Sequence, residues 1–88
     1  MTLEEFKEKL VKIDKNIKIL EMYDYNIIFE MNFSHIATFG VLLNNKTGNF
    51  NFVKYYDFPF GGTLLKNATL KEILKKIKKG TIDDLRRI

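Results

Sequence analysis

Residues 25–56 read YNIIFEMNFSHIATFGVLLNNKTGNFNFVKYY, and this stretch decides the fold. Apolar and polar side chains alternate in three parts of it. Successive residues of a β-strand point to opposite faces of a sheet, so each part predicts a strand with one apolar face. Together the three parts predict an antiparallel meander. The predicted apolar face comprises Ile27, Phe29, Met31 and Phe33, then Ala37, Phe39, Val41 and Leu43, and finally Phe50 and Phe52.

Polar and glycine-containing spots separate these strands. The segment 44–49 (NNKTGN) predicts a hairpin loop in which Gly48 is free to take a positive φ. Gly40 interrupts the third strand and indicates a bulge or a close approach of the backbone. Residues 17–23 predict an additional strand of weaker pattern, in which Leu20 and Met22 share a face with Lys18. Its charge suits the edge of the sheet, where charged residues discourage pairing with other molecules.

An amphipathic helix is predicted on each side of the sheet sequence. Thr2 and Glu5 have the spacing of a capping box, and a helical apolar stripe follows, which predicts a helix over Leu3–Ile13. Thr69 and Glu72 repeat the capping box before a second stripe, and Gly80 is expected to end that helix. The second stripe consists of Leu70, Ile73, Leu74 and Ile77. Thr81 with Asp84 predicts a short terminal helix.

These elements define one α+β domain over residues 1–88. It consists of an N-terminal helix, a four-stranded antiparallel meander, a basic amphipathic helix and a short terminal helix. An apolar sheet face must be covered, so the helices are expected to pack on one face of the sheet. The predicted core comprises Leu3, Phe6, Leu10, Ile27, Phe29, Phe39, Val41, Leu70, Ile73, Leu74 and Ile77.

Composition restricts the chemistry and the location. The chain has no cysteine, which excludes disulfides and thiolate metal sites and fits a reducing compartment. The acidic, periodic start at residues 1–5 differs from a signal peptide. No apolar run reaches the roughly 18 residues that a membrane span needs. We therefore expect a cytoplasmic protein that does not cross a membrane.

The sequence lacks a recognisable set of catalytic residues. His35 is the one histidine, and its neighbour Ser34 would point to the opposite face of a strand, so the two do not form a nucleophile–base pair. One histidine with dispersed acids does not supply a metal site. The Gly61-Gly62-Thr63 segment lacks the spacing of a phosphate-binding loop. We expect no catalytic residue, no metal and no cofactor.

Positive charge is concentrated in the second helix. Residues 1–65 hold seven lysines against eight acids, whereas residues 66–79 hold six lysines against Glu72 alone. Such a face is either an ordinary solvated surface or an electrostatic footprint for phosphate backbone or an acidic protein. The candidate binding lysines, placed away from the apolar stripe, are Lys71, Lys75, Lys76, Lys78 and Lys79.

An aromatic segment precedes this helix. Phe58 and Phe60 flank Pro59, and two glycines follow, which predicts a loop of defined shape over residues 57–63. Two interpretations remain open. Either at least one ring folds back into the core, or both rings point outward as an aromatic anchor for a partner.

The element order resembles that of a double-stranded RNA-binding domain, a family with a basic final helix. Residues 35–39 (HIATF) match its H-x-x-x-F pattern, and Lys66 lies near the start of the corresponding helix. The family's Gly-Pro before the histidine is missing. Residues 67–69 (NAT) replace its paired lysines, and an additional strand precedes His35. No functional residue is therefore transferred.

The leading hypothesis is a small non-catalytic binding protein that occupies a surface of a larger protein or nucleoprotein assembly. Frequent lysine, isoleucine and asparagine are typical of AT-rich genes of low-GC bacteria and their phages. In size and α+β build the chain is similar to small phage-encoded inhibitors of bacterial defence, including anti-CRISPR proteins, although no motif is shared. The alternatives are a nucleic-acid-binding domain that uses the same lysines and a structural module that forms a homodimer through a strand edge.

Overall fold

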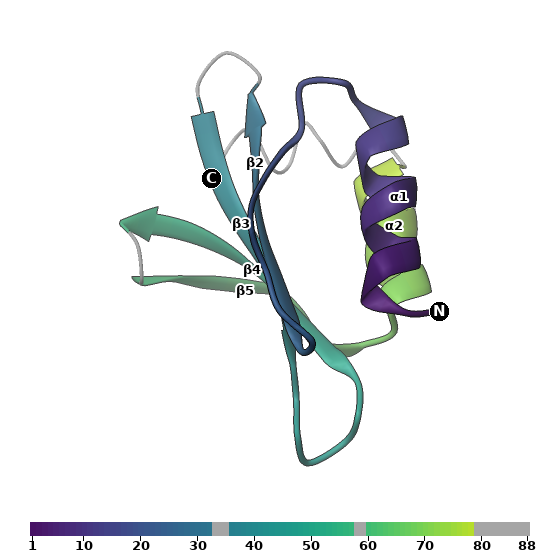
Figure 1. Ribbon diagram of the computed structural model, residues 1–88. Coiled ribbons are helices and arrows are strands. Elements are labelled where there is room, and N and C mark those ends of the chain that lie inside the picture. Colours follow the sequence, from purple (N-terminus) through teal and green to yellow (C-terminus); the bar gives the residue numbers. More distant parts are fainter. Residues whose placement is uncertain (33–35, 58–59, 79–88) are drawn as a thin grey trace.

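The computed structural model describes residues 1–32, 36–57 and 60–78, and these form an α+β fold. The strands form one antiparallel sheet in the order β1-β2-β3-β4-β5. Both helices lie side by side on one face of that sheet, as predicted (Figure 1). The elements are α1 (Leu3–Ile13), β1 (Lys18–Met22), β2 (Asn26–Asn32), β3 (Ile36–Leu43), β4 (Phe50–Asp57), β5 (Phe60–Ala68) and α2 (Leu70–Lys78).

The prediction of four strands is wrong, because β5 adds a fifth within the described residues. The predicted loop over residues 57–63 overlaps this strand from Phe60 onward. Two glycines near the start of β5 are typical of a loop, so the sequence did not indicate a strand there. The pairing of β5 with β4 also shifts register at three places, and burial along the strand therefore does not alternate. Gly61 makes the pairing possible, since a Cβ there would overlap the backbone carbonyl oxygen of Lys54.

The faces predicted for β1 are also wrong. Its pairing with β2 changes register between Ile19 and Glu21, which is a β-bulge or similar irregularity. The extra residue shifts the alternation. Ile19 and Met22 consequently pack against the core, while Leu20 is exposed. The predicted edge position of this strand is confirmed.

Three phenylalanine rings form the centre of the core, between the sheet and the helices. Phe39 lies with its ring centroid 5.7 Å from that of Phe29 and 5.7 Å from that of Phe52. Every predicted core residue is buried. Among the described residues, the buried cluster consists of Leu3, Phe6, Leu10, Ile17, Ile27, Phe29, Met31, Ala37, Phe39, Val41, Phe52, Ala68, Leu70, Ile73, Leu74 and Ile77.

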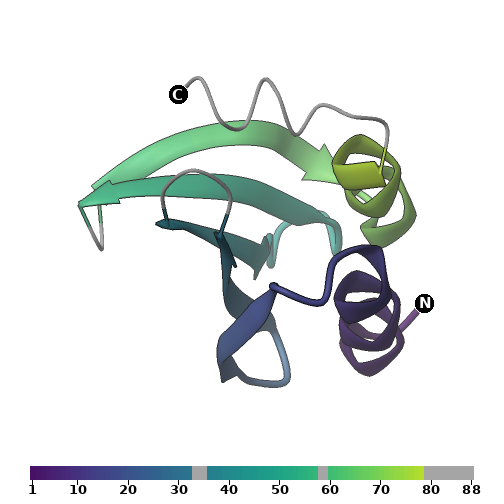
Figure 2. The same cartoon turned by 90° about the horizontal axis from the view of Figure 1, so that it is seen from above.

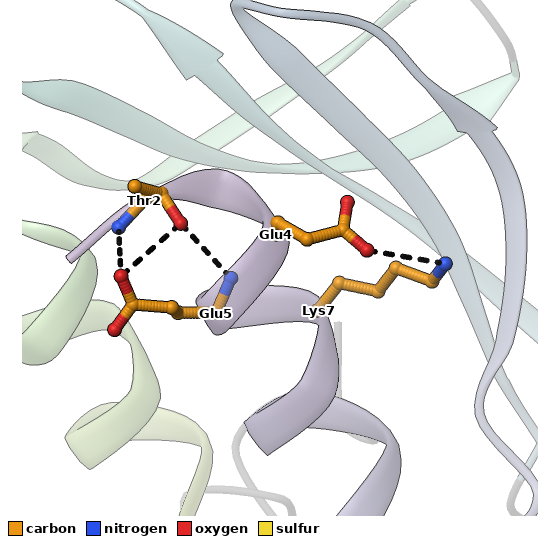
Figure 3. A network of polar contacts seen from close by, with 4 residues as sticks. All are labelled: Thr2, Glu4, Glu5 and Lys7. Atoms are coloured by element: carbon orange, nitrogen blue, oxygen red, sulfur yellow. Dashed lines mark hydrogen bonds and ion pairs between the residues drawn. The ribbon is translucent and has the colours of Figure 1, made fainter.

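Both predicted capping boxes are confirmed. The Glu5 N–H donates to Thr2 Oγ1 over 3.1 Å, and the Thr2 N–H donates to Glu5 Oε1 over 3.4 Å (Figure 3). An ion pair of 3.9 Å between Lys7 and Glu4 lies on the next turn (Figure 3). The reciprocal bonds of Thr69 and Glu72 are 3.1 Å each. These bonds satisfy amides that the first helical turn leaves without partners.

The two helices run in the same direction along the sheet. Each begins toward the end of the molecule where the β3–β4 hairpin lies (Figure 1). Seen from above, the helices are neighbours, and the β4–β5 hairpin extends away from them (Figure 2). In the described part of the chain, no helix has the length and apolar character of a membrane span.

Several predictions fall on residues outside the described ranges. These are the turn at Ser34 and His35, the position of Phe58, the helix end at Gly80 and the terminal helix from Thr81.

The cap of α2 makes stability depend on pH. The Thr69 backbone N–H and hydroxyl both donate to the Glu72 carboxylate, and this lowers the pKa of Glu72 below its ordinary value of 4.5. Because the folded-state pKa is depressed, the contribution is present above the unfolded pKa and is lost as pH falls through the folded one.

Thr69→Ala removes the hydroxyl bond and keeps the stronger contribution of the Thr69 N–H, so it should return the pKa of Glu72 only part of the way toward its ordinary value. Loss of the threonine cap should cost about 1 kcal/mol of stability at neutral pH. An NMR titration of the Glu72 side chain together with urea unfolding at two pH values measures both effects. Thr63→Ala, a change at an exposed threonine of β5, is the control. An unchanged Glu72 titration in Thr69→Ala would contradict a contribution of the Thr69 hydroxyl to the shift.

Candidate functional site

A groove of about 960 Å³ lies where α1, α2 and the β3–β4 hairpin meet. Its walls come from three separate parts of the chain. The lining residues are Met1, Glu5 and Lys9 on the side of α1, Gly48, Asn49 and Phe50 from the hairpin and the start of β4, and Thr69, Leu70, Lys71, Leu74, Lys75 and Lys78 from the side of α2.

The groove combines apolar side chains with a basic rim. Leu70 and Leu74 are buried, and the half-buried Phe50 packs against the core beside them. Four exposed lysines line the groove, namely Lys9, Lys71, Lys75 and Lys78. Among the described residues, no ion pair joins any of these four ammonium groups to an acid.

In the part of the chain that the structure describes, one acidic side chain lines the groove, and it already has a structural role. The carboxylate of Glu5 accepts from the N–H and the hydroxyl of Thr2 in the cap of α1 (Figure 3). The side chains of the described lining residues, four lysines and this one glutamate, carry a formal charge of +3 at neutral pH. The groove is thus a positive site bounded by apolar surface.

Helical periodicity brings the lysines of α2 together. Lys71, Lys75 and Lys78 follow one another at i, i+4 and i+7, so they share a stripe of the helix. This stripe runs beside the buried leucine stripe, and both contribute to the groove. Lys9 stands across from them on α1, four residues after Glu5.

Backbone features outside the helices fix the segment that leads into α2 and the hairpin that forms the third wall of the groove. Asn67 has φ 56°, and its N–H donates to Asn51 Oδ1 over 2.9 Å, which ties the end of β5 to β4 just before α2 begins. In the hairpin, Gly48 takes φ 78° as predicted, and the Asn44 N–H donates to the Asn49 carbonyl over 2.7 Å. This hydrogen bond closes the hairpin turn that forms the third wall of the groove.

The predicted site residues do not form one surface. Lys71, Lys75 and Lys78 come together in the groove, whereas Lys76 is half-buried on α2 and does not line it. Phe60 is 72% exposed and is the first residue of β5. That strand starts on the side of the sheet remote from the helices (Figure 2). Lys79 and Phe58 lie outside the described residues.

Sequence reasoning missed two ionisable residues of β4. Lys54 is only 3% exposed on the helix-covered face of the sheet, and burial lowers its pKa. Tyr55 points to the opposite face, where its ring contacts the site that a Cβ on Gly40 would occupy. Burial raises the pKa of Tyr55, and the negative charge of Glu21 raises it further. Both strand pairings are regular at Gly40, so its role is this close approach and not a bulge.

Comparisons with protein-family models, with curated proteins and with solved structures give no match for this chain. Among residues 1–32, 36–57 and 60–78, no three histidine, aspartate or glutamate side chains converge as a metal site requires. The groove is the feature of the described structure with the clearest capacity to hold a ligand.

Proposed function

We propose that the protein is a small non-catalytic binding protein that acts by occupying a surface of a larger protein or nucleoprotein assembly. The groove between α1 and α2 carries this proposal, because apolar groups next to its lysines match the usual anatomy of a protein–protein contact. Charge complementarity then selects an acidic partner surface. Inhibition of a host-defence complex is the role of this kind that we favour, on the basis of size and residue usage.

A protein surface fits the groove better than bare nucleic acid does. The exposed Met1 and the half-buried Phe50 supply apolar surface to the groove, and covering it takes apolar groups, which a phosphate backbone lacks. Single-stranded nucleic acid is commonly held by exposed aromatic rings, and the one ring in the groove, Phe50, is half-buried. Nucleic-acid binding through the same lysines remains the alternative to be tested.

Site-specific photo-cross-linking in native-host extract tests the proposal directly. Lys75 is replaced by p-benzoyl-phenylalanine, and Lys46, an exposed lysine of the hairpin, receives the same group as the control. We expect a protein adduct from position 75 and none from position 46. An adduct with nucleic acid would establish the alternative. Equal labelling at both positions, or none at position 75, would refute the assignment of the groove.

Binding should depend on the lysines of the groove and not on the total charge of the helix. The double variant Lys75→Gln with Lys78→Gln is expected to weaken binding of the cross-linked partner about 10- to 100-fold at low ionic strength. The loss of affinity should be smaller at high salt, because added salt screens exposed charges. Lys76→Gln removes one charge from the same helix outside the groove, and Lys76→Gln with Lys66→Gln matches the double variant in charge. Fluorescence anisotropy measures all of these variants. An equal loss in both double variants would show a diffuse charge effect.

A further inference from the structure

The sheet ends at β1, a strand that pairs on one side. Among the described residues, β1 is hydrogen-bonded to β2 alone. Alternate N–H and C=O groups of an edge strand point away from the sheet, where a further strand can pair with them. We infer that this edge pairs with the β1 edge of a second copy of the chain, antiparallel and about a two-fold axis. None of the described residues that line the groove belongs to β1, so this surface is separate from the groove.

The irregularity in β1 brings two opposite charges to the same face of the sheet. Lys18 lies opposite Glu30 of β2. Glu21 lies opposite Ile28. These two residues of β2 are two positions apart in a regularly paired strand, so they share a face, and Lys18 and Glu21 share it with them. Residues three positions apart in a regular strand would point to opposite faces, so the extra residue of the bulge is what places this exposed lysine and this exposed glutamate together.

A two-fold axis sets these charges opposite each other. When Lys18 of one copy lies opposite Glu21 of the other, symmetry forms the same contact a second time with the copies exchanged. Directly opposite residues of paired strands share a face of the sheet. Lys18 and Glu21 meet this requirement, since both lie on the face opposite the helices. Oppositely charged cross-strand pairs are favourable, so the edge is complementary to itself.

The apolar residues of this edge fit the same register. Between the charged pairs, Ile19 of one copy lies opposite Leu20 of the other, and the pairing covers part of the Leu20 side chain, which is 42% exposed in the single chain. Beyond the charged pairs, Met22 lies opposite Ile17, and both of these residues pack on the core side of the sheet. A register shifted by one residue would set Lys18 opposite Met22, which lies on the other face. That register does not fit.

Charge favours a second copy over other strands. Charged side chains on an edge oppose pairing with strands in general. A strand without matching charges would leave Lys18 and Glu21 beside apolar or like-charged groups, whereas a second copy supplies the complement of both. Within its own sheet Glu21 lies opposite the apolar Ile28, and the second copy adds a cation there. A five-residue strand makes a small contact, so the dimer is expected to be weak and to depend on protein concentration.

Charge reversal at these two positions tests the pairing. Sedimentation velocity at low ionic strength, from about 10 µM to 1 mM chain to suit a weak interface, is expected to show a monomer–dimer equilibrium. Lys18→Glu and Glu21→Lys each set like charges opposite each other and should weaken self-association by about tenfold or more. The control is Lys46→Glu, which reverses the charge of an exposed lysine in the β3–β4 hairpin and should change self-association by less than about threefold.

Rescue separates lost charge pairing from damage to the fold. An equimolar mixture of Lys18→Glu and Glu21→Lys should form a heterodimer, because one chain then carries two glutamates at these positions and the other carries two lysines. The double variant Lys18→Glu with Glu21→Lys should self-associate within about threefold of the original chain, since both pairs are restored with the charges exchanged. Failure of both the mixture and the double variant to associate would overturn the charge-paired register.

Isotope-filtered NMR of mixed labelled and unlabelled chains locates the contact. Nuclear Overhauser contacts are expected between residue 18 of one copy and residue 21 of the other. A monomer at every concentration up to about 1 mM would overturn the inference, and so would intermolecular contacts from another element in place of β1. An equal loss of self-association in Lys18→Glu and Lys46→Glu would also overturn it. The cross-linking at position 75 decides the proposed function independently of these outcomes.

Discussion

Phe39→Ala is expected to destabilise the fold by about 3–5 kcal/mol. Phe39 has no exposed surface, and its ring packs against those of both Phe29 and Phe52 at the centre of the core. Alanine removes most of the apolar surface that the ring buries and leaves a cavity that the paired strands β2, β3 and β4 cannot close. A domain of this size commonly has about 5–15 kcal/mol of stability in total, so the variant is expected to be marginal or unfolded.

Urea unfolding followed by circular dichroism measures this effect. Phe39→Leu keeps most of the apolar volume and should cost much less than alanine. Tyr56→Ala removes an aromatic ring from β4 that is mostly exposed, and it should change the free energy of unfolding by less than about 1 kcal/mol. A comparable loss in Phe39→Ala and Tyr56→Ala would contradict the assignment of the core centre.

Gly61→Ala is the second large effect, with an expected cost of about 2–3 kcal/mol. The added methyl group would overlap the backbone carbonyl of Lys54 and come within 2.9 Å of Tyr55 Cα. Both obstacles belong to backbone, so relief requires β4 and β5 to separate. That separation breaks the pairing of Lys54 with Gly62 and of Tyr55 with Gly61.

The neighbouring glycine supplies the matched control. At Gly62 a Cβ would come within 2.9 Å of the Tyr56 hydroxyl, which is the far end of an exposed and flexible side chain. Gly62→Ala should therefore cost clearly less than Gly61→Ala in the same urea experiment. Equal costs would show that loss of glycine flexibility, and not the close approach to Lys54, determines both values.

Features of the fold that depend on local residue patterns could be predicted from the sequence. The strands that contain Phe29, Phe39 and Phe52 alternate cleanly, and both helices have a capping box and an apolar stripe. Their placement on one sheet face follows from the need to cover these phenylalanines. A local pattern is informative where a residue's environment is set by its own element, which holds for Phe6 on α1 and Ile73 on α2.

The edges of the sheet could not be predicted in the same way. An extra residue in β1 reverses the alternation after Ile19, and the register shifts of β5 remove the alternation from that strand. Edge strands have one neighbour, so they tolerate such irregularities better than central strands do. Gly61 and Gly62 are typical of a loop in sequence, and only the approach of Lys54 shows why a strand needs a glycine there.

The candidate site was predictable in part. Lysines of α2 were recognised from charge density, but the charge pattern does not separate Lys75, in the groove, from Lys76, outside it. Lys9 and Phe50 contribute from other elements, and no local pattern brings them to α2. A groove formed by three distant segments exists only at the tertiary level.

The packing of α1 against α2 has a consequence for folding kinetics. Residues 3–13 and 70–78 are in contact although the whole sheet separates them in the sequence, which raises the contact order and is expected to slow folding relative to a helical bundle of equal length. We therefore expect the binding-competent state, which needs both helices in place, to be reached late. In stopped-flow refolding, recovery of ligand binding should coincide with the final phase of burial and should not precede it.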